Sequence, residues 1–322
     1  MARKAHSTLT LVGAGLLSLA AIALLVGTGA GQEVRAERLT LVHDGIERAY
    51  FLTVPPQVLS ASPRVPLVIV LHGGGNGVNA MDMTGFAEKA IEEGFIAVFP
   101  EGTGRTTLLT WNAGHCCGYA MTNDIDDVGF IAALIDALVA SQPVDPDRVY
   151  VTGMSNGAMM THRLGIELAE RIVAIGPVVG GLFGDEPNPA APVSAIIFNG
   201  ALDQSIPMAG GPTGGRFAGA WDGTPLIPAA HQAAYWAAAD RCNPAAEVAD
   251  GPVFTLSRYS CPPGIEVEYY LVKDNGHAWP GGRAGSVRGD VPTELLNATE
   301  MMWDFFRLHS RAGALPVAPA AP

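Results

Sequence analysis

Residues 148–164 read Arg-Val-Tyr-Val-Thr-Gly-Met-Ser-Asn-Gly-Ala-Met-Met-Thr-His-Arg-Leu, and this stretch decides which fold we expect of the chain. Its β-branched and aromatic beginning predicts a strand over 148–152, and its end predicts a helix over 156–170. The Gly-Met-Ser-Asn-Gly segment around Ser155 therefore lies in a tight turn between them. Such a turn is typical of a nucleophile elbow, in which a glycine on each side lets the serine hydroxyl project. The alternative is a serine with a purely structural role in a turn.

Strands and helices alternate on both sides of this turn. Short apolar runs predict buried strands, and segments with helical periodicity lie between them. This alternation predicts one domain of the α/β class, with a doubly wound, mainly parallel sheet and helices on both faces. Together with the serine turn it leads us to expect an α/β-hydrolase fold. The predicted strands cover residues 38–43, 48–54, 66–71, 95–99, 148–152, 173–179, 193–198 and 265–272, and the predicted helices cover 79–93, 124–139, 156–170, 228–241 and 294–308.

A serine hydroxyl is a weak nucleophile at neutral pH and needs a neighbouring base. In the α/β-hydrolase chain order, an acid and then a histidine follow the serine. Asp203 and His277 each follow a predicted strand, and catalytic groups of open α/β sheets lie in loops beyond the carboxyl ends of strands. We therefore predict Ser155 as nucleophile, His277 as base and Asp203 as the acid that orients it. The alternatives have no leading buried strand or lie in helical segments, and they are His231, His309, Asp185, Asp222, Asp240 and Asp250.

A glycine-rich segment, His72-Gly-Gly-Gly75, directly follows the predicted strand 66–71. Segments of this type supply one N–H of an oxyanion hole, and the residue after the nucleophile supplies the other. We therefore predict Gly74 and Asn156 as the two donors, with Gly73 or Gly75 as alternatives to Gly74. A flexible loop is the structural alternative.

The composition limits the classes of function. The chain has 322 residues, 31 acidic and 19 basic side chains and a formal net charge of −12. A nucleic-acid binder needs a basic face that displaces counterions from phosphates, so we exclude that class, and we infer no obligate protein partner. No further ligands stand at metal spacing from the cysteines, so we expect no metal site there.

The ends of the chain differ from its middle. Arg3 and Lys4 precede an apolar run and then small residues, which predicts a secretory signal peptide over 1–30, with an uncleaved membrane anchor as the alternative. The catalytic domain is expected over 31–310, and an Ala/Pro-rich disordered tail over 311–322. A secreted protein can keep disulfides, and we predict one between Cys242 and Cys261. Adjacent cysteines are poor partners for an ordinary disulfide, so Cys116 and Cys117 form either a strained ring or two thiols.

Several motifs occur here in one order: His72-Gly-Gly-Gly75, Trp111-Asn-Ala-Gly114 with Cys116-Cys117-Gly118, Asp124-Ile-Asp-Asp-Val-Gly-Phe-Ile131, the Ser155 pentapeptide and Gly276-His-Ala-Trp-Pro-Gly281. Over residues 39–308 the chain resembles the polyhydroxybutyrate depolymerase and feruloyl esterase family of secreted esterases. The resemblance implies an acyl-serine mechanism without metal or organic cofactor, and it places nucleophile, acid and base on the same three residues. His72, Trp111 and Trp279 are the candidate substrate-binding residues. The two tryptophans resemble walls of the family's substrate cleft, with core or rim packing as the alternative.

The expected activity is hydrolysis of a carboxylic ester, either a polyhydroxybutyrate-type oligomer or a feruloyl or acetyl ester of a plant polysaccharide. Many depolymerases of solid polyester carry a separate binding domain after the catalytic one, and this chain ends in a short tail, which favours soluble esters. The alternatives are an acyltransferase or peptidase with the same fold, or a catalytically idle surface-binding protein.

Overall fold

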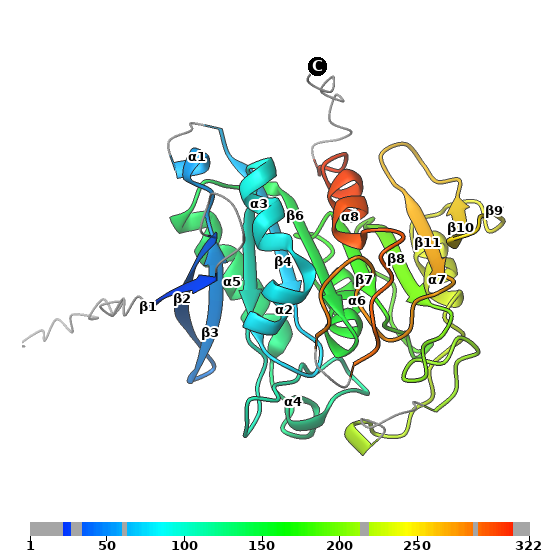
Figure 1. Ribbon diagram of the computed structural model, residues 1–322, viewed down its shortest axis with the longest axis horizontal. Helices are drawn as coiled ribbons and strands as arrows, with labels where there is room; N and C mark the ends of the chain where they lie inside the picture. The colour runs from blue at the N-terminus through cyan, green and yellow to red at the C-terminus, as the bar shows by residue number, and fades with distance from the viewer. Residues whose placement is uncertain (1–21, 27–33, 60–62, 213–218, 286–288, 312–322) are drawn as a thin grey trace, which may run out of the picture.

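Short runs of valine, isoleucine and leucine form the parallel centre of a mixed sheet (Figure 1). The computed structural model describes residues 22–26, 34–59, 63–212, 219–285 and 289–311. Neighbouring central strands run parallel in the order β5, β4, β6, β7, β8, β11. Their bounds are Ile96–Pro100 for β5, Val65–Leu71 for β4, Val144–Met154 for β6, Ala174–Val178 for β7, Ser194–Gly200 for β8 and Val267–Val272 for β11.

Antiparallel strands extend the sheet at both edges. On one side β3, Ile46–Thr53, pairs with β5 and continues into β2, Val34–His43, and β1, Ile22–Val26. On the other side β10, Phe254–Tyr259, and β9, Ala246–Asp250, follow β11. The turn residues Asp44 and Gly45 between β2 and β3 have the positive φ angles that a tight hairpin requires.

Helices cover both faces of the sheet, because strand side chains alternate between two apolar cores. Leu67 and Ile69 of β4 belong to one core, whereas Val68 and Val70 belong to the other, and all four are fully buried. The first core includes side chains from α5, Asp127–Ser141, α6, Asn156–Glu167, and α7, His231–Ala239. The second includes α2, Gly77–Thr84, α3, Phe86–Glu93, and α8, Ala298–Phe306, which lie in front of the sheet in Figure 1. The predicted doubly wound α/β fold is confirmed.

Some predicted boundaries are wrong for local physical reasons. The helix predicted over 79–93 is two helices, because Gly85 between α2 and α3 has a φ of 69° and its N–H caps the Met81 carbonyl. Asp126 caps α5 by accepting the Gly129 N–H, so this helix begins later than predicted. Sequence patterns also did not predict the edge strands β1, β9 and β10 or the short helices α1, Pro56–Leu59, and α4, Gly118–Thr122.

Two disulfides are present among the described residues. The predicted bond joins Cys242 to Cys261, and the adjacent Cys116 and Cys117 are bonded to each other. Most of the predicted signal peptide and all of the tail after Arg311 lie outside the described residues, although β1 falls within the apolar leader segment. Within the described ranges, no helix combines the length and apolar character that crossing a bilayer requires.

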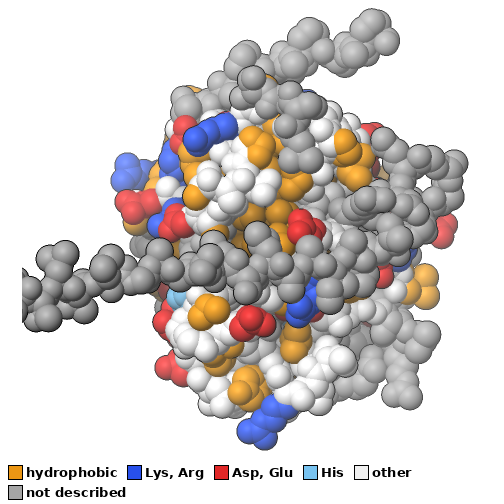
Figure 2. All heavy atoms as spheres, turned by 90° about the vertical axis from the view of Figure 1, so that its left-hand side faces the viewer, with side chains coloured by type: hydrophobic (Ala, Val, Ile, Leu, Met, Phe, Trp, Pro, Cys, Tyr) orange, Lys and Arg blue, Asp and Glu red, His pale blue; other side chains and the backbone are white. Residues whose placement is uncertain are grey.

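The face of the molecule that carries β2 and β3 has acidic and basic side chains interspersed among apolar ones (Figure 2). Basic side chains do not gather into a single patch there. This distribution agrees with the composition, in which acidic residues outnumber basic ones by 31 to 19.

Burial of Asp240, at the end of α7, generates a prediction about stability and pH. One carboxylate oxygen accepts the Val193 N–H at 3.1 Å, and burial raises the pKa of Asp240 from 3.8 to about 7. The folded state thus favours the protonated carboxyl, and this contribution is present below pH 4 and lost as the pH rises through 7. We expect Asp240→Asn, which cannot ionise, to gain stability relative to the parent as the pH rises from 4 to 8, measured by urea unfolding.

Asp250→Asn is the matched control. Hydrogen bonds and the charge of Lys273 lower the pKa of Asp250, so its ionised form stabilises the folded state. We therefore expect Asp250→Asn to lose stability relative to the parent as the pH rises from 4 to 8, the opposite of Asp240→Asn. A stability difference between Asp240→Asn and the parent that is the same at every pH would contradict the prediction.

Candidate active site

Ser155 stands in a strained turn between β6 and α6. Its φ of 57° lies in a region that residues with a side chain rarely adopt, so the surrounding backbone must hold it there. The two glycines of the pentapeptide make this possible. A Cβ on Gly153 would lie 2.6 Å from the Gly157 carbonyl oxygen, and one on Gly157 would lie 2.6 Å from the Leu71 carbonyl oxygen and closer still to that of His72. The turn therefore packs its backbone directly against the end of β4.

The structure brings Ser155, His277 and Asp203 together from three segments. His277 Nε2 lies 2.9 Å from Ser155 Oγ, and His277 Nδ1 lies 2.8 Å from Asp203 Oδ2. An ionised carboxylate only accepts hydrogen bonds, so Nδ1 carries the proton and Nε2 can accept from the serine hydroxyl. The segments follow the carboxyl ends of β6, β8 and β11, which meet at one edge of the sheet because these strands are parallel.

Asp203 is held by its own loop. Its side chain is buried, and Oδ1 accepts the N–H groups of Ser205 at 2.7 Å and Ile206 at 2.9 Å. These bonds direct the other oxygen, Oδ2, toward His277. The carboxylate is thus fixed before any ligand binds, which is what orienting an imidazole requires.

Two residues that sequence reasoning missed hold the loop that carries His277. Asp290 Oδ2 accepts the backbone N–H of His277 at 2.6 Å. Asn275 is fully buried and donates to the carbonyls of Gly276 and Ala278, both at 2.9 Å, while it accepts the Thr293 N–H. Asn275 lies two residues before His277, and this closeness in the sequence is a signal that it could hold the loop. Nothing in the sequence indicates that Asp290 folds back onto this loop.

His72 uses both ring nitrogens inside the protein. Nε2 accepts the Gly102 N–H at 2.9 Å, so Nδ1 carries the proton and donates to the Gly73 carbonyl at 2.6 Å. Burial lowers the pKa of His72 to about 4, so the ring is neutral at pH 7. Although His72 lines the pocket beside Ser155, it has no ring nitrogen left for a substrate. Contact of His72 with substrate stays a prediction, and we expect it through atoms other than the two ring nitrogens.

The two segments predicted to supply oxyanion-hole donors, the glycine-rich segment and the start of α6, both lie next to Ser155. A Cβ at Gly73 would lie 3.2 Å from the Ser155 Cβ, and Gly74 lines the same pocket. Asn156 is the first residue of α6, so its N–H has no partner within the helix, and the helix end adds a partial positive charge. The Asn156 side chain is turned away to the backbone of Trp111.

A pocket of about 300 Å³ opens at Ser155 and His277. Its apolar lining includes Met83, Leu108 and Met154, and Trp279 forms part of its wall while its indole N–H donates to Thr299 Oγ1. Trp111 is not among the lining residues. Its side chain is fully buried and its indole N–H donates to the His72 carbonyl, so the structure places Trp111 in the core beside the site, in agreement with the alternative of core packing.

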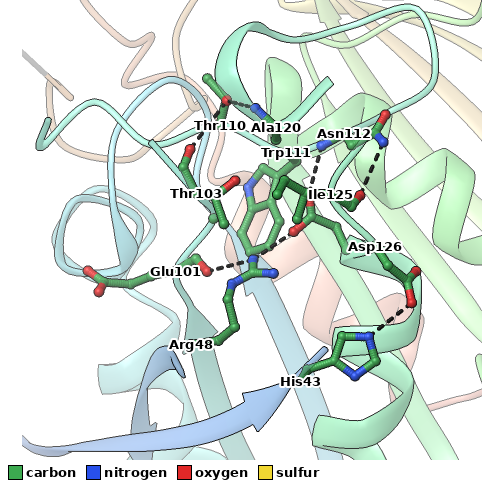
Figure 3. A network of polar contacts seen from close by, with 12 residues as sticks. His43, Arg48, Glu101, Thr103, Thr110, Trp111, Asn112, Ala120, Ile125 and Asp126 are labelled. Carbon is green, nitrogen blue, oxygen red and sulfur yellow. Dashed lines mark hydrogen bonds and ion pairs between the residues drawn. The ribbon is translucent and has the colours of Figure 1, made fainter. Parts of the chain in front are cut away.

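One surface cluster has the composition of a metal site. His43, Asp44 and Asp126 offer ligand atoms within 4.8 Å of one another, and Figure 3 shows His43 pointing to Asp126, with Nε2 2.9 Å from Oδ2. Both carboxylates are exposed. Asp126 also caps α5, so the contact is explained by helix capping and a surface hydrogen bond.

A parallel sheet that presents a serine elbow, a histidine and an aspartate at one edge defines the α/β-hydrolase class. Comparisons with known proteins agree. The family described as Esterase PHB depolymerase matches residues 48–209, and the chain belongs to this family of carboxylic ester hydrolases.

The individual relatives share only about a quarter of their aligned residues with this chain. Feruloyl esterase B of Piromyces equi is 27% identical over 71% of this chain and 42% of its own length. The poly(3-hydroxybutyrate) depolymerase of Ralstonia pickettii is 25% identical over 91% of this chain and 64% of its own length. The chain thus spans less than two thirds of both relatives. The solved structure of acetyl xylan esterase from Aspergillus awamori superposes with a TM-score of 0.53 at 14% identity, covering 80% of this chain and 94% of that one, which shows the shared fold.

The close packing of the elbow generates a prediction. Gly157→Ala places a methyl group against the backbone carbonyls of Leu71 and His72, which cannot move without displacing β4. We expect a loss of unfolding free energy of at least about 2 kcal/mol, measured by urea unfolding. Gly219→Ala is the matched control, because a Cβ there has no neighbour within 4 Å, and it should change stability by less than about 0.5 kcal/mol. Equal effects of the two substitutions would contradict this account of the elbow.

Proposed function

We propose that the chain is a serine esterase that hydrolyses carboxylic esters through an acyl intermediate on Ser155. The observation that carries this proposal is the unbroken relay from Asp203 through His277 to Ser155, with contacts of 2.8 and 2.9 Å, which ends at a pocket. In this arrangement the imidazole can take the serine proton, while the carboxylate holds the ring and stabilises its protonated form.

The reaction has two halves. Ser155 Oγ attacks the ester carbonyl carbon, its proton moves to His277 Nε2, and the tetrahedral intermediate collapses when His277 gives that proton to the leaving alcohol. Water then attacks the acyl-serine, with His277 again as base, and release of the acid regenerates the serine hydroxyl. In both halves negative charge develops on the former carbonyl oxygen. The N–H groups of Asn156 and Gly74 are the proposed donors to this oxygen.

The pocket supports small, soluble esters as substrates. A cavity of about 300 Å³ is at the lower end of the range for ligand sites and suits one acyl unit. Met83, Leu108 and Met154 give it an apolar lining that a short hydroxyalkanoate oligomer or a feruloyl or acetyl ester can fill. We further propose that the protein is exported. The Cys242–Cys261 disulfide supports this localisation, because such bonds persist in oxidising compartments.

Replacing the nucleophile tests the proposed chemistry. We expect Ser155→Ala to lower kcat on p-nitrophenyl acetate by about 10⁴-fold or more, with an unchanged thermal transition, because Ser155 carries the one hydroxyl among the described residues that line the pocket. Ser141→Ala removes an exposed hydroxyl that only bonds the Ala137 carbonyl on α5, and it should keep full activity. A fluorophosphonate probe should label the parent and Ser141→Ala but not Ser155→Ala. Retained activity or labelling in Ser155→Ala would refute the mechanism.

A substrate panel tests the proposed specificity. Methyl ferulate, acetylated xylan and soluble 3-hydroxybutyrate oligomers are compared with a suspension of solid polyhydroxybutyrate, and acid release is followed by titration at constant pH. We expect at least one soluble ester to be hydrolysed faster, per ester bond available, than the solid polymer, because the pocket accepts single acyl units. Faster release from the solid polymer than from every soluble ester would contradict this specificity while leaving the serine mechanism intact.

A further inference from the structure

Trp111 makes three hydrogen bonds to the two segments that flank Ser155, although its side chain is fully buried. Its backbone N–H donates to Asn156 Oδ1 at 2.7 Å, and its backbone carbonyl accepts from Asn156 Nδ2 at 3.0 Å. Its indole N–H donates to the His72 carbonyl at 2.9 Å. One residue thus contacts both the residue after the serine and the first residue of the glycine-rich segment.

These contacts fix the orientation of backbone N–H groups. The His72 carbonyl and the Gly73 N–H belong to one planar peptide group, so holding the oxygen sets the direction of the N–H. The next peptide group is set in the same way, because the His72 imidazole donates to the Gly73 carbonyl at 2.6 Å and thereby orients the Gly74 N–H. On the other side, the two bonds from Trp111 hold Asn156 at the start of α6.

A buried ion pair supports the loop that carries Trp111 (Figure 3). Arg48 and Asp127 are 2.6 Å apart, with side chains 3% and 0% exposed. The second oxygen of Asp127 accepts the Asn112 N–H at 2.7 Å, and the Arg48 guanidinium donates to the Glu101 carbonyl and lies 4.1 Å from the Phe130 ring centre. Buried charges are tolerated when they are paired and hydrogen-bonded in this way.

We propose that Trp111 is a positioning residue that holds the two oxyanion-donor segments at a fixed separation, with the Arg48–Asp127 pair anchoring its loop. The inference rests on the proposed function and adds to it a residue that does not touch substrate. Donors of an oxyanion hole stabilise the transition state only when they are oriented in advance, and small displacements weaken them strongly. We call the three hydrogen bonds of Trp111 to His72 and Asn156 the brace. Loss of the brace should lower kcat and leave KM almost unchanged.

The test is Trp111→Phe, which keeps an aromatic ring in the core and removes the indole N–H. Trp236→Phe is the matched control, because Trp236 is equally buried and its indole N–H donates at 3.0 Å to Nδ1 of His162, further along α6, and not to His72 or Asn156. With p-nitrophenyl acetate, we expect kcat of Trp111→Phe to fall about tenfold or more, with KM within about twofold of the parent. Trp236→Phe should keep kcat within about twofold.

A transition-state analogue separates positioning from general loss of stability. Phenylboronic acid accepts Ser155 Oγ at boron and forms a tetrahedral adduct with an oxygen in the oxyanion hole. Its inhibition constant should rise in Trp111→Phe by about the same factor as kcat falls, and should stay near the parent value in Trp236→Phe. If Trp111→Phe does not fold, Asn156→Ala is tested instead, because it removes the two bonds between Trp111 and Asn156 and keeps the Asn156 backbone N–H. We again expect a lower kcat and a higher inhibition constant.

The possible failures are distinguishable. If Ser155→Ala remains active, the proposed function itself is wrong. If Ser155→Ala is inactive but the folded brace variant matches Trp236→Phe in kcat and boronate affinity, the function stands and the positioning role of Trp111 is refuted. A rise in KM with an unchanged kcat would also refute it, because that result would indicate a contact with bound substrate.

Discussion

The close backbone approach between the serine turn and the end of β4 is the constraint on which the rest of the structure depends. Gly153 and Gly157 allow this approach, and any side chain at either position would collide with a backbone carbonyl. The approach fixes Ser155 at a positive φ and places the Gly73 segment beside it. Because both segments end neighbouring parallel strands, the sheet brings them side by side, and contacts from the loops then hold them in their relative orientation.

Three further loops, which carry Asp203, His277 and Trp111, complete the active site. Each catalytic candidate is oriented by a backbone or side-chain contact that is independent of substrate: Asp203 by two N–H groups of its own loop, and His277 by Asp290. Trp111 adds a contact that joins the two donor segments from behind. An active site built from groups already held in place has little to reorganise when charge develops in the transition state.

The sequence predicted the fold class and the three residues of the relay, because the strand–turn–helix pattern around Ser155 and the buried strands before Asp203 and His277 are local signals. Contacts between distant segments gave no such signal. Asp127 lies in an acidic run that helix capping alone could explain, and only the structure shows that Asp126 caps α5 while Asp127 pairs with Arg48 from β3. Trp111 was predicted to line the cleft from the family resemblance, with core packing as the alternative. Its burial depends on β3, α5 and the elbow together, which no local pattern reveals.

Direct detection of the acyl intermediate is the most decisive measurement for the central claim. A p-nitrophenyl ester is mixed with the enzyme, the reaction is stopped with acid during turnover, and the digested peptides are examined by mass spectrometry. The account predicts that the peptide containing Ser155 gains the mass of the acyl group less one hydrogen. Acylation of a different residue, or rapid turnover with no acylated peptide at any quench time, would contradict it.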